Sequence, residues 1–202
     1  MKSIYKITFL LLLYPIMVSA HMDEKKHEKN RIIKKEYKVN ANAKVAIDNR
    51  YGNLNITTWN KNRVEIEVTI TVKGDDLESV KDKLADIDVD FESSLGLVFA
   101  KTRFEKEQKS WSFWKKNDNI SYQINYKVKM PKTNTVDLNN DYGSIYLDNL
   151  SGKADIKCQY GKIYVGELFG NNNNINLDYC SSSTIAFMKS GNINVDYSKI
   201  TI

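Results

Sequence analysis

The stretch VDLNNDYGSIYLDNLSG, residues 136–152, holds the pattern that decides the fold. Its Tyr-Gly pair stands between two short runs of alternating apolar and polar residues, and a similar unit, ADIKCQYGKIYVGEL, follows at residues 154–168. The unit recurs twice more at spacings of 18, 19 and 18 residues, and its marker tyrosines are Tyr142, Tyr160, Tyr179 and Tyr197. A fixed period of this kind indicates an internal repeat.

Each repeat unit predicts two β-strands joined at a corner. Alternate positions are apolar before each marker tyrosine and again after each Tyr-Gly pair, which is the pattern of strands with one buried face. Glycine at the corner, as at Gly143 and Gly161, would supply the positive φ angle of a sharp turn. The marker tyrosines share the parity of the apolar positions, so we expect their rings in the core. Asn49 and Asn140 share it too and would need partners, which a hydrogen-bonded ladder or a corner-capping role would supply.

One such unit cannot bury its apolar face alone, but copies stacked about 4.8 Å apart would share a continuous core. We therefore predict a mainly β fold: a parallel β-solenoid with two-strand coils of about 18 residues. An antiparallel meander or sandwich, in which each Tyr-Gly pair is a hairpin turn, is the alternative. Hairpin turns usually carry Asn-Gly or Asp-Gly instead.

An earlier copy of the unit lies at residues 45–56 and contains Tyr51-Gly52. Residues 60–131 then interrupt the repeat and predict an inserted β-rich cap with one short helix, which would begin near Leu77. The cap would cover the open end of the stack, since an exposed sheet edge favours aggregation. Its expected strands cover residues 64–72, 87–91, 97–104 and 120–130.

The third unit departs from the pattern because Cys180 replaces the corner glycine and three serines follow. We expect a bulge or a wider corner there. In register, Cys158 and Cys180 lie about three residues apart along neighbouring strands, which puts their Cα atoms near or beyond the ~7 Å limit for a disulfide. The sequence therefore predicts free thiols, with Cys158 buried.

Residues 1–20 have the anatomy of a signal peptide, with Lys2 and Lys6 before an apolar run and small residues before a cleavage point after Ala20. The run of 12 apolar residues is shorter than the ~20 that span a membrane. We expect export to the periplasm, the outer surface or the medium.

After cleavage we expect a polar basic leader at 21–38, read as a solvated tail, and a single solenoid domain at 39–202. Within the domain, residues 132–202 form the repeat coils. Because the chain stops inside an apolar strand, we expect either C-terminal truncation or an open coil that another chain covers by oligomerisation.

The residues available for catalysis are few. No histidine follows His27, and no arginine follows Met130. We expect no enzyme activity, no cofactor and no metal. A pectate-lyase-like β-helix enzyme stays open as an alternative, since stacking would align Asp141, Asp178 and Asp196, although Gln159 interrupts that column. The formal net charge of +5 falls to +3 without the two signal lysines, which is too small to predict nucleic-acid binding.

Two aromatic groups are candidate binding sites for an envelope glycan, lipid or protein. The first is an aromatic and basic segment whose rings could instead plug the solenoid. Its residues are Trp111, Phe113, Trp114, Lys115 and Lys116. The second group is Tyr146 and Tyr164, which have outward parity on successive second strands; such a pair can also be an ordinary sheet contact.

The repeat strings quoted above, INVDYSKITI at 193–202, and NITTWNKNRVEIEVTITVKG at 55–74 resemble the bacterial "putative adhesin" domains of unknown function, akin to the head-GIN autotransporter adhesins. The resemblance covers about residues 37 to 202. It implies an exported, adhesin-like β-solenoid of the bacterial envelope without established catalysis. A non-catalytic surface or structural module is the function we expect, and an envelope sensor or assembly factor is a further alternative.

Overall fold

The computed structural model describes residues 26–105 and 119–202. The expected signal peptide lies outside the described residues, and so does the segment with Trp111, Phe113, Trp114, Lys115 and Lys116. The described elements are β1 (His27–Lys38), β2 (Lys44–Arg50), β3 (Leu54–Trp59), β4 (Arg63–Gly74), α1 (Leu77–Asp86), β5 (Ile87–Ser94), β6 (Leu97–Phe104), β7 (Ser121–Pro131), β8 (Thr135–Asp141), β9 (Ser144–Leu147), β10 (Ala154–Gln159), β11 (Lys162–Leu168), β12 (Asn173–Asp178), β13 (Ser183–Met188), β14 (Gly191–Asp196) and β15 (Ile200–Thr201).

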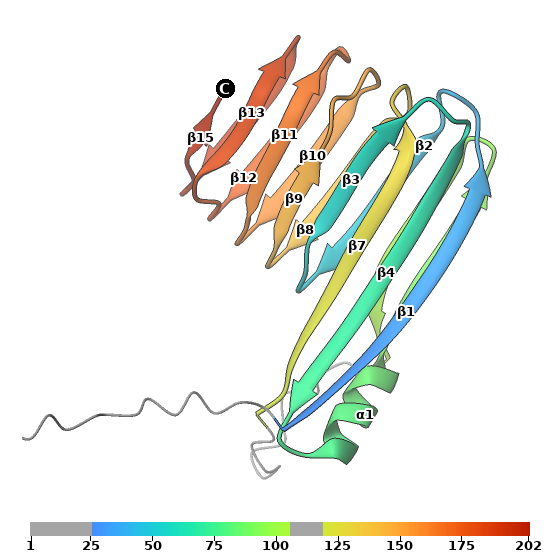
Figure 1. Cartoon of the computed structure of the whole chain (residues 1–202). Helices are drawn as coiled ribbons and strands as arrows, with labels where there is room; N and C mark the ends of the chain where they lie inside the picture. The colour runs from blue at the N-terminus through green and yellow to red at the C-terminus, as the bar shows by residue number, and fades with distance from the viewer. Residues whose placement is uncertain (1–25, 106–118) are drawn as a thin grey trace, which may run out of the picture.

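These strands form two sheets that lie face to face (Figure 1). Sheet A has the order β1-β4-β7-β3-β9-β11-β13-β15, and sheet B has the order β14-β12-β10-β8-β2-β6-β5. Neighbours are parallel from β7 to β15 in sheet A and from β6 to β14 in sheet B. The expected mainly β fold is confirmed. The hairpin alternative is wrong, because β8 and β9 flank the Tyr142-Gly143 pair and lie in different sheets.

Each marker tyrosine joins a strand of sheet B to a strand of sheet A, and we call such a pair of strands a coil. The coils keep one register, so that Leu138 pairs with Ile156 and Ile156 pairs with Ile175. These three side chains are almost fully buried between the sheets. The residues directly before and after each of them along its strand face outward. The period of two in the sequence therefore gives each coil one apolar inner face, and successive coils share the core.

The corner works differently from the expectation. The positive φ angle belongs to the tyrosine, with 58° at Tyr142 and 51° at Tyr160, and not to the glycine that follows. Gly143 is needed for another reason: a β-carbon there would lie 1.9 Å from the carbonyl oxygen of Gly52 in the coil below. Because the left-handed residue reverses the alternation of the strand, the tyrosine side chains leave the core and point outward.

The insertion at 60–131 contains the elements that the sequence predicts, β4, α1, β5, β6 and β7. It does not simply cover the end of the stack. Instead, β7 and β4 extend sheet A beside β3, and β6 and β5 extend sheet B beside β2 (Figure 1). Asp76 caps the N-terminus of helix α1, and its carboxylate accepts a hydrogen bond from the Ser79 amide at 2.8 Å. In the part of the chain that the structure describes, no helix is long and apolar enough to cross a membrane.

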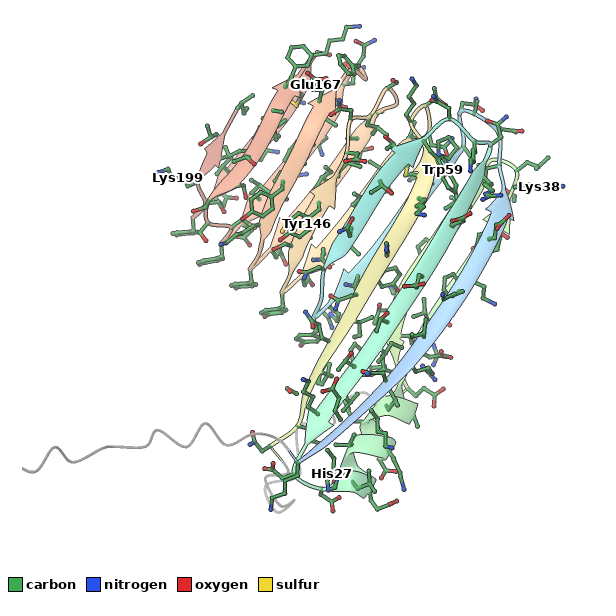
Figure 2. All side chains as sticks on the ribbon, in the orientation of Figure 1. His27, Lys38, Trp59, Tyr146, Glu167 and Lys199 are labelled. Atoms are coloured by element: carbon green, nitrogen blue, oxygen red, sulfur yellow. The ribbon has the colours of Figure 1, made fainter. Side chains whose placement is uncertain are left out.

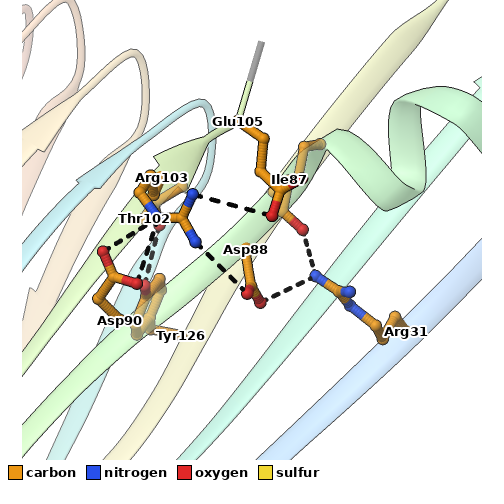
Figure 3. A network of polar contacts seen from close by, with 8 residues as sticks. All are labelled: Arg31, Ile87, Asp88, Asp90, Thr102, Arg103, Glu105 and Tyr126. Carbon is orange, nitrogen blue, oxygen red and sulfur yellow. Dashed lines mark hydrogen bonds and ion pairs between the residues drawn. The ribbon is translucent and has the colours of Figure 1, made fainter.

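The outermost strands of this extended end, β1 and β5, are tied together by charged side chains (Figure 3). Arg31 of β1 donates hydrogen bonds to the carbonyl oxygen of Ile87 and to Asp88 of β5. Arg103 of β6 forms ion pairs with Asp88 at 3.8 Å and Asp90 at 3.2 Å. The arrangement links the edges of the two sheets.

The leader expected to be a solvated tail is largely a strand. Residues His27–Lys38 form β1, which pairs with β4 over twelve residues, from His27 opposite Gly74 to Lys38 opposite Arg63. The sequence does not predict this strand, because both of its faces carry mostly polar side chains. Of its residues, only Ile33 and Tyr37 pack against the core. The division of the chain into domains stays a prediction.

The expectations for the two cysteines are confirmed. Both are free and buried. Cys158 pairs in register with Leu177, three residues before Cys180, and the Cys180 thiol donates to the Cys158 carbonyl oxygen at 3.2 Å. The hydrogen-bonded Cys180 side chain and burial raise the pKa of Cys158. The third corner is wider, as expected, because Ser182 takes a second positive φ angle of 54° after Tyr179.

Candidate binding surface

Five tyrosines form a continuous row of stacked rings along the corner of the coils, which we call the corner row. Figure 2 draws the side chains on the coils, with Tyr146 of β9 labelled. Neighbouring ring centroids lie 4.9 to 5.2 Å apart, and the ring planes differ by 6° to 10°. This spacing follows from the ~4.8 Å separation of neighbouring strands, because each coil contributes one ring at the same register position. The members are Tyr51, Tyr142, Tyr160, Tyr179 and Tyr197.

The expected inward direction of these rings is wrong. Tyr142, Tyr160 and Tyr179 are 50%, 48% and 48% exposed. Stacked rings cover one another's faces, so the exposed parts are the ring edges and the hydroxyl groups. Desolvation is the largest cause that raises the pKa of Tyr160, and the neighbouring Tyr142 and Tyr179 raise it further. A protonated hydroxyl can donate and accept hydrogen bonds, so the row presents repeated polar contacts on an aromatic support.

A second, shorter row lies on the outer face of sheet A. Tyr146 of β9 and Tyr164 of β11 pair in register, and their ring centroids are 5.0 Å apart with planes 9° from parallel. Both are partly exposed, at 40% and 37%, in the outward positions that the sequence indicates. The row has two members because β13 places Thr184 and β3 places Asn55 at the matching positions.

A shallow groove of about 540 Å³ lies beside the corner row. Tyrosines of the row line it together with Gly143, Gly161 and Lys162. The two glycines are partly exposed in the groove. An extended ligand lying along the groove would meet the same chemistry on each coil, because the coils share one register.

A buried hydrogen-bond chain supports the corner from inside. Asn49 donates to the Asn140 side-chain oxygen at 2.9 Å, and Asn140 donates to the Gly52 carbonyl oxygen at 3.0 Å. Thr102 donates to Asn49 at 2.8 Å and lies 2.9 Å from the Tyr126 hydroxyl. The expected asparagine ladder is confirmed, and it holds the first two coils in register.

The aspartates considered for catalysis do form a column on the outer face of sheet B. Asp141 pairs with Gln159, Gln159 with Asp178, and Asp178 with Asp196. Gln159 donates to Asp178 at 3.3 Å, and Arg50 lies 3.4 Å from Asp141. Among residues 26–105 and 119–202, no group of three or more histidines, cysteines or acids could hold a metal ion.

Sequence reasoning missed Trp59, at the end of β3. Three cations lie over its indole ring, with Lys61 at 5.0 Å, Arg63 at 5.1 Å and Lys129 at 5.8 Å from the ring centroid. The alternation of Trp59, Lys61 and Arg63 along the chain was the available signal. Lys129 could not be found in this way, because it comes from β7 and arrives only through sheet pairing.

No protein-family model and no curated protein matches the chain. Solved structures with similarity include a putative cell adhesion protein from Clostridium sporogenes, with 11% identity over 80% of this chain and 74% of that chain and a TM-score of 0.43. A putative adhesin from Bacteroides fragilis has 17% identity over 84% and 73% of the two chains and a TM-score of 0.39. A putative adhesin from Parabacteroides distasonis has 11% identity over 85% and 67%, with a TM-score of 0.31.

Proposed function

We propose that this chain is a non-catalytic interaction module of the bacterial envelope or cell surface, built as a β-solenoid that presents its exposed tyrosine rows to a partner. The observation that carries the proposal is the corner row, in which five rings stack at 4.9 to 5.2 Å on one edge of the molecule. Tyrosine is well suited to recognition, because it offers a large ring and a polar tip with little side-chain entropy to lose.

The solenoid geometry supports this role because it repeats the same contact. Each coil adds one tyrosine and one length of groove in the same register. A partner with its own repeat, such as an envelope polysaccharide, would make several weak contacts at once. Linked weak contacts raise the overall affinity well above that of a single contact.

Export is part of the proposal and is supported by the pattern of residues 1–20. We expect the exported protein to begin near His21. N-terminal sequencing of protein recovered from the envelope fraction tests this, and recovery of the full chain from the cytosol would count against the proposed address.

The role of the tyrosine rows is tested by binding of the full chain to whole cells, isolated envelope polysaccharide and lipid vesicles. In the test variant, Tyr146→Ser and Tyr164→Ser are combined with Tyr160→Asn, since asparagine tolerates the positive φ angle of 51°. Retention on at least one of the three surfaces should fall by about tenfold or more.

The control is Ile32→Ser, which removes an exposed apolar side chain from β1, away from both rows. It should bind as the wild type does. A wild type that binds none of the three surfaces, or equal binding by the tyrosine variant, would overturn the proposed role.

A further inference from the structure

We propose that a second site, which meets the corner row only at Tyr51, binds the ring of a neutral hexopyranose. The site is a cleft of about 530 Å³ at the junction between the coils and the inserted strands. It lies where β2, β6 and β8 end beside one another, with α1 and β7 completing the wall. Its volume is within the range of about 300 to 1,000 Å³ that is usual for small-molecule sites.

One wall of the cleft is aromatic. Tyr51 meets Tyr122 edge to face at 5.2 Å between centroids and Phe104 at 6.1 Å. All three rings are partly buried and line the cleft. Lys83 of α1 holds its ammonium group 4.9 Å and 4.8 Å from the Phe104 and Tyr122 centroids. The parts of these rings that Lys83 leaves uncovered can contact the C–H face of a sugar ring, which is apolar.

The cleft also contains two hydrogen-bond acceptors that have no partner among the described residues. The side-chain oxygens Asn139 Oδ1 and Asp141 Oδ1 are buried, and neither has a hydrogen-bond partner among the described residues. Asn139 and Asp141 lie two residues apart on the outward side of β8, which separates them by about 7 Å along the strand. Leaving a buried acceptor unsatisfied is unfavourable, so rotation of the two side chains toward the cleft and donation by two ligand hydroxyl groups would relieve both sites.

The charges of the cleft favour a neutral ligand. Each of its four cations already has an acidic partner: Arg50 with Asp141 at 3.4 Å, Lys101 with Asp48 at 3.0 Å, Lys83 with Asp86 at 2.7 Å, and Arg103 with Asp90 at 3.2 Å.

An anionic sugar would therefore meet no uncompensated positive charge and would face the oxygens of Asn139 and Asp141. A cationic ligand would face the guanidinium and ammonium groups that line the same cleft. A hydroxyl group fits both sets of neighbours, because it donates to the free oxygens and accepts from Arg50 or Lys101.

The test is saturation-transfer NMR on the full chain with methyl glycosides of glucose, galactose, mannose and N-acetylglucosamine. Galacturonate and choline serve as the anionic and cationic probes. We expect saturable binding of at least one neutral glycoside, with a dissociation constant on the order of millimolar and little dependence on salt.

Asn139→Ala should weaken binding by about tenfold, which corresponds to the loss of one hydrogen-bonding partner. Asn176→Ala is the matched control, because Asn176 occupies the same register column two coils away and does not line the cleft. Tyr122→Leu is the second variant and removes part of the aromatic wall. Circular dichroism of all three variants checks that they fold.

The proposal is overturned if no neutral glycoside binds, if only galacturonate or choline binds, or if Asn139→Ala and Tyr122→Leu both bind as the wild type does. The variant that lacks Tyr146, Tyr160 and Tyr164 should keep its glycoside affinity. A variant that loses cell binding but keeps glycoside binding, or one that loses glycoside binding but keeps cell binding, therefore tests the two proposals independently.

Discussion

Gly143 lies directly over Gly52, so close that a β-carbon on Gly143 would be 1.9 Å from the Gly52 carbonyl oxygen. Gly161 has the same relationship to Gly143, at 2.0 Å. The tyrosine before each glycine takes the left-handed conformation that turns the chain. The two halves of the Tyr-Gly pair thus do different work: the tyrosine makes the corner, and the glycine lets successive coils approach to strand-pairing distance.

Gly143→Ala should destabilise the protein, because the added methyl group would force the backbones of two coils apart. We expect a loss of about 1 to 3 kcal/mol in the free energy of unfolding, as for other overpacked sites. Gly96→Ala is the control, since a β-carbon there meets nothing within 4 Å. Denaturant unfolding of both variants measures the effect. Equal stability of the two would contradict the close approach of the coils.

Substitutions of Tyr160 should be ranked by their tolerance of its positive φ angle. Tyr160→Asn loses the ring contacts with Tyr142 and Tyr179, each worth about 0.5 to 1.5 kcal/mol. Tyr160→Val loses the same contacts and also forces a β-branched residue into the left-handed region, at a further cost of about 1 to 2 kcal/mol. Thermal unfolding should therefore rank wild type, asparagine and valine in that order. A valine variant as stable as the asparagine variant would argue against a corner at the tyrosine.

The buried side chain of Asn140 should matter far more than an exposed asparagine in a similar ladder. Asn140→Ala removes the side-chain acceptor of one Asn49 hydrogen bond and the side-chain donor to the Gly52 carbonyl oxygen, which we expect to cost about 1 to 3 kcal/mol. Asn194→Ala removes an exposed bond of 2.7 Å to Asn176 and should change stability by less than about 0.5 kcal/mol. The comparison uses chemical denaturation. Similar losses in both variants would mean that burial does not decide the contribution of the ladder.

Periodicity was enough to predict the strands of the coils and their shared register, because the inner face of each coil must be apolar. Leu138 and Ile156 are paired and buried as the pattern requires. Parity failed at the marker tyrosines, since alternation holds only while the backbone stays extended. A single left-handed residue interrupts this alternation, and the local sequence does not predict that a tyrosine will adopt that conformation.

Of the candidate sites, likewise, one could be predicted from the sequence and the other could not. Tyr146 and Tyr164 lie within regular strands, so their outward position could be read from the sequence. The cleft could not, because Lys83, Tyr122 and Asn139 come from three elements far apart in the chain. The inserted strands bring them together through sheet pairing. Strand β1 could not be predicted for a related reason, because it forms by pairing with β4 and its own sequence has no clear apolar alternation.

The hydroxyl group of Tyr126 should make the protein sensitive to alkaline pH. Thr102 has one hydroxyl proton and gives it to Asn49, so Tyr126 is the donor in its 2.9 Å bond with Thr102. Burial raises the pKa of Tyr126 above its ordinary value of about 10, and ionisation would also break this hydrogen bond.

Because the pKa of Tyr126 is higher in the folded chain than in the unfolded chain, its contribution to stability is complete below about pH 10 and is lost as the pH rises further. At pH 7 we expect Tyr126→Phe to be less stable than the wild type by about 1 kcal/mol, the value of one hydrogen bond. This difference should shrink above pH 10, since the phenylalanine variant has no proton to lose there. Denaturant unfolding of both proteins across the alkaline range measures the gap, and a gap that stays constant would show that Tyr126 ionises as readily in the folded protein as in the unfolded one.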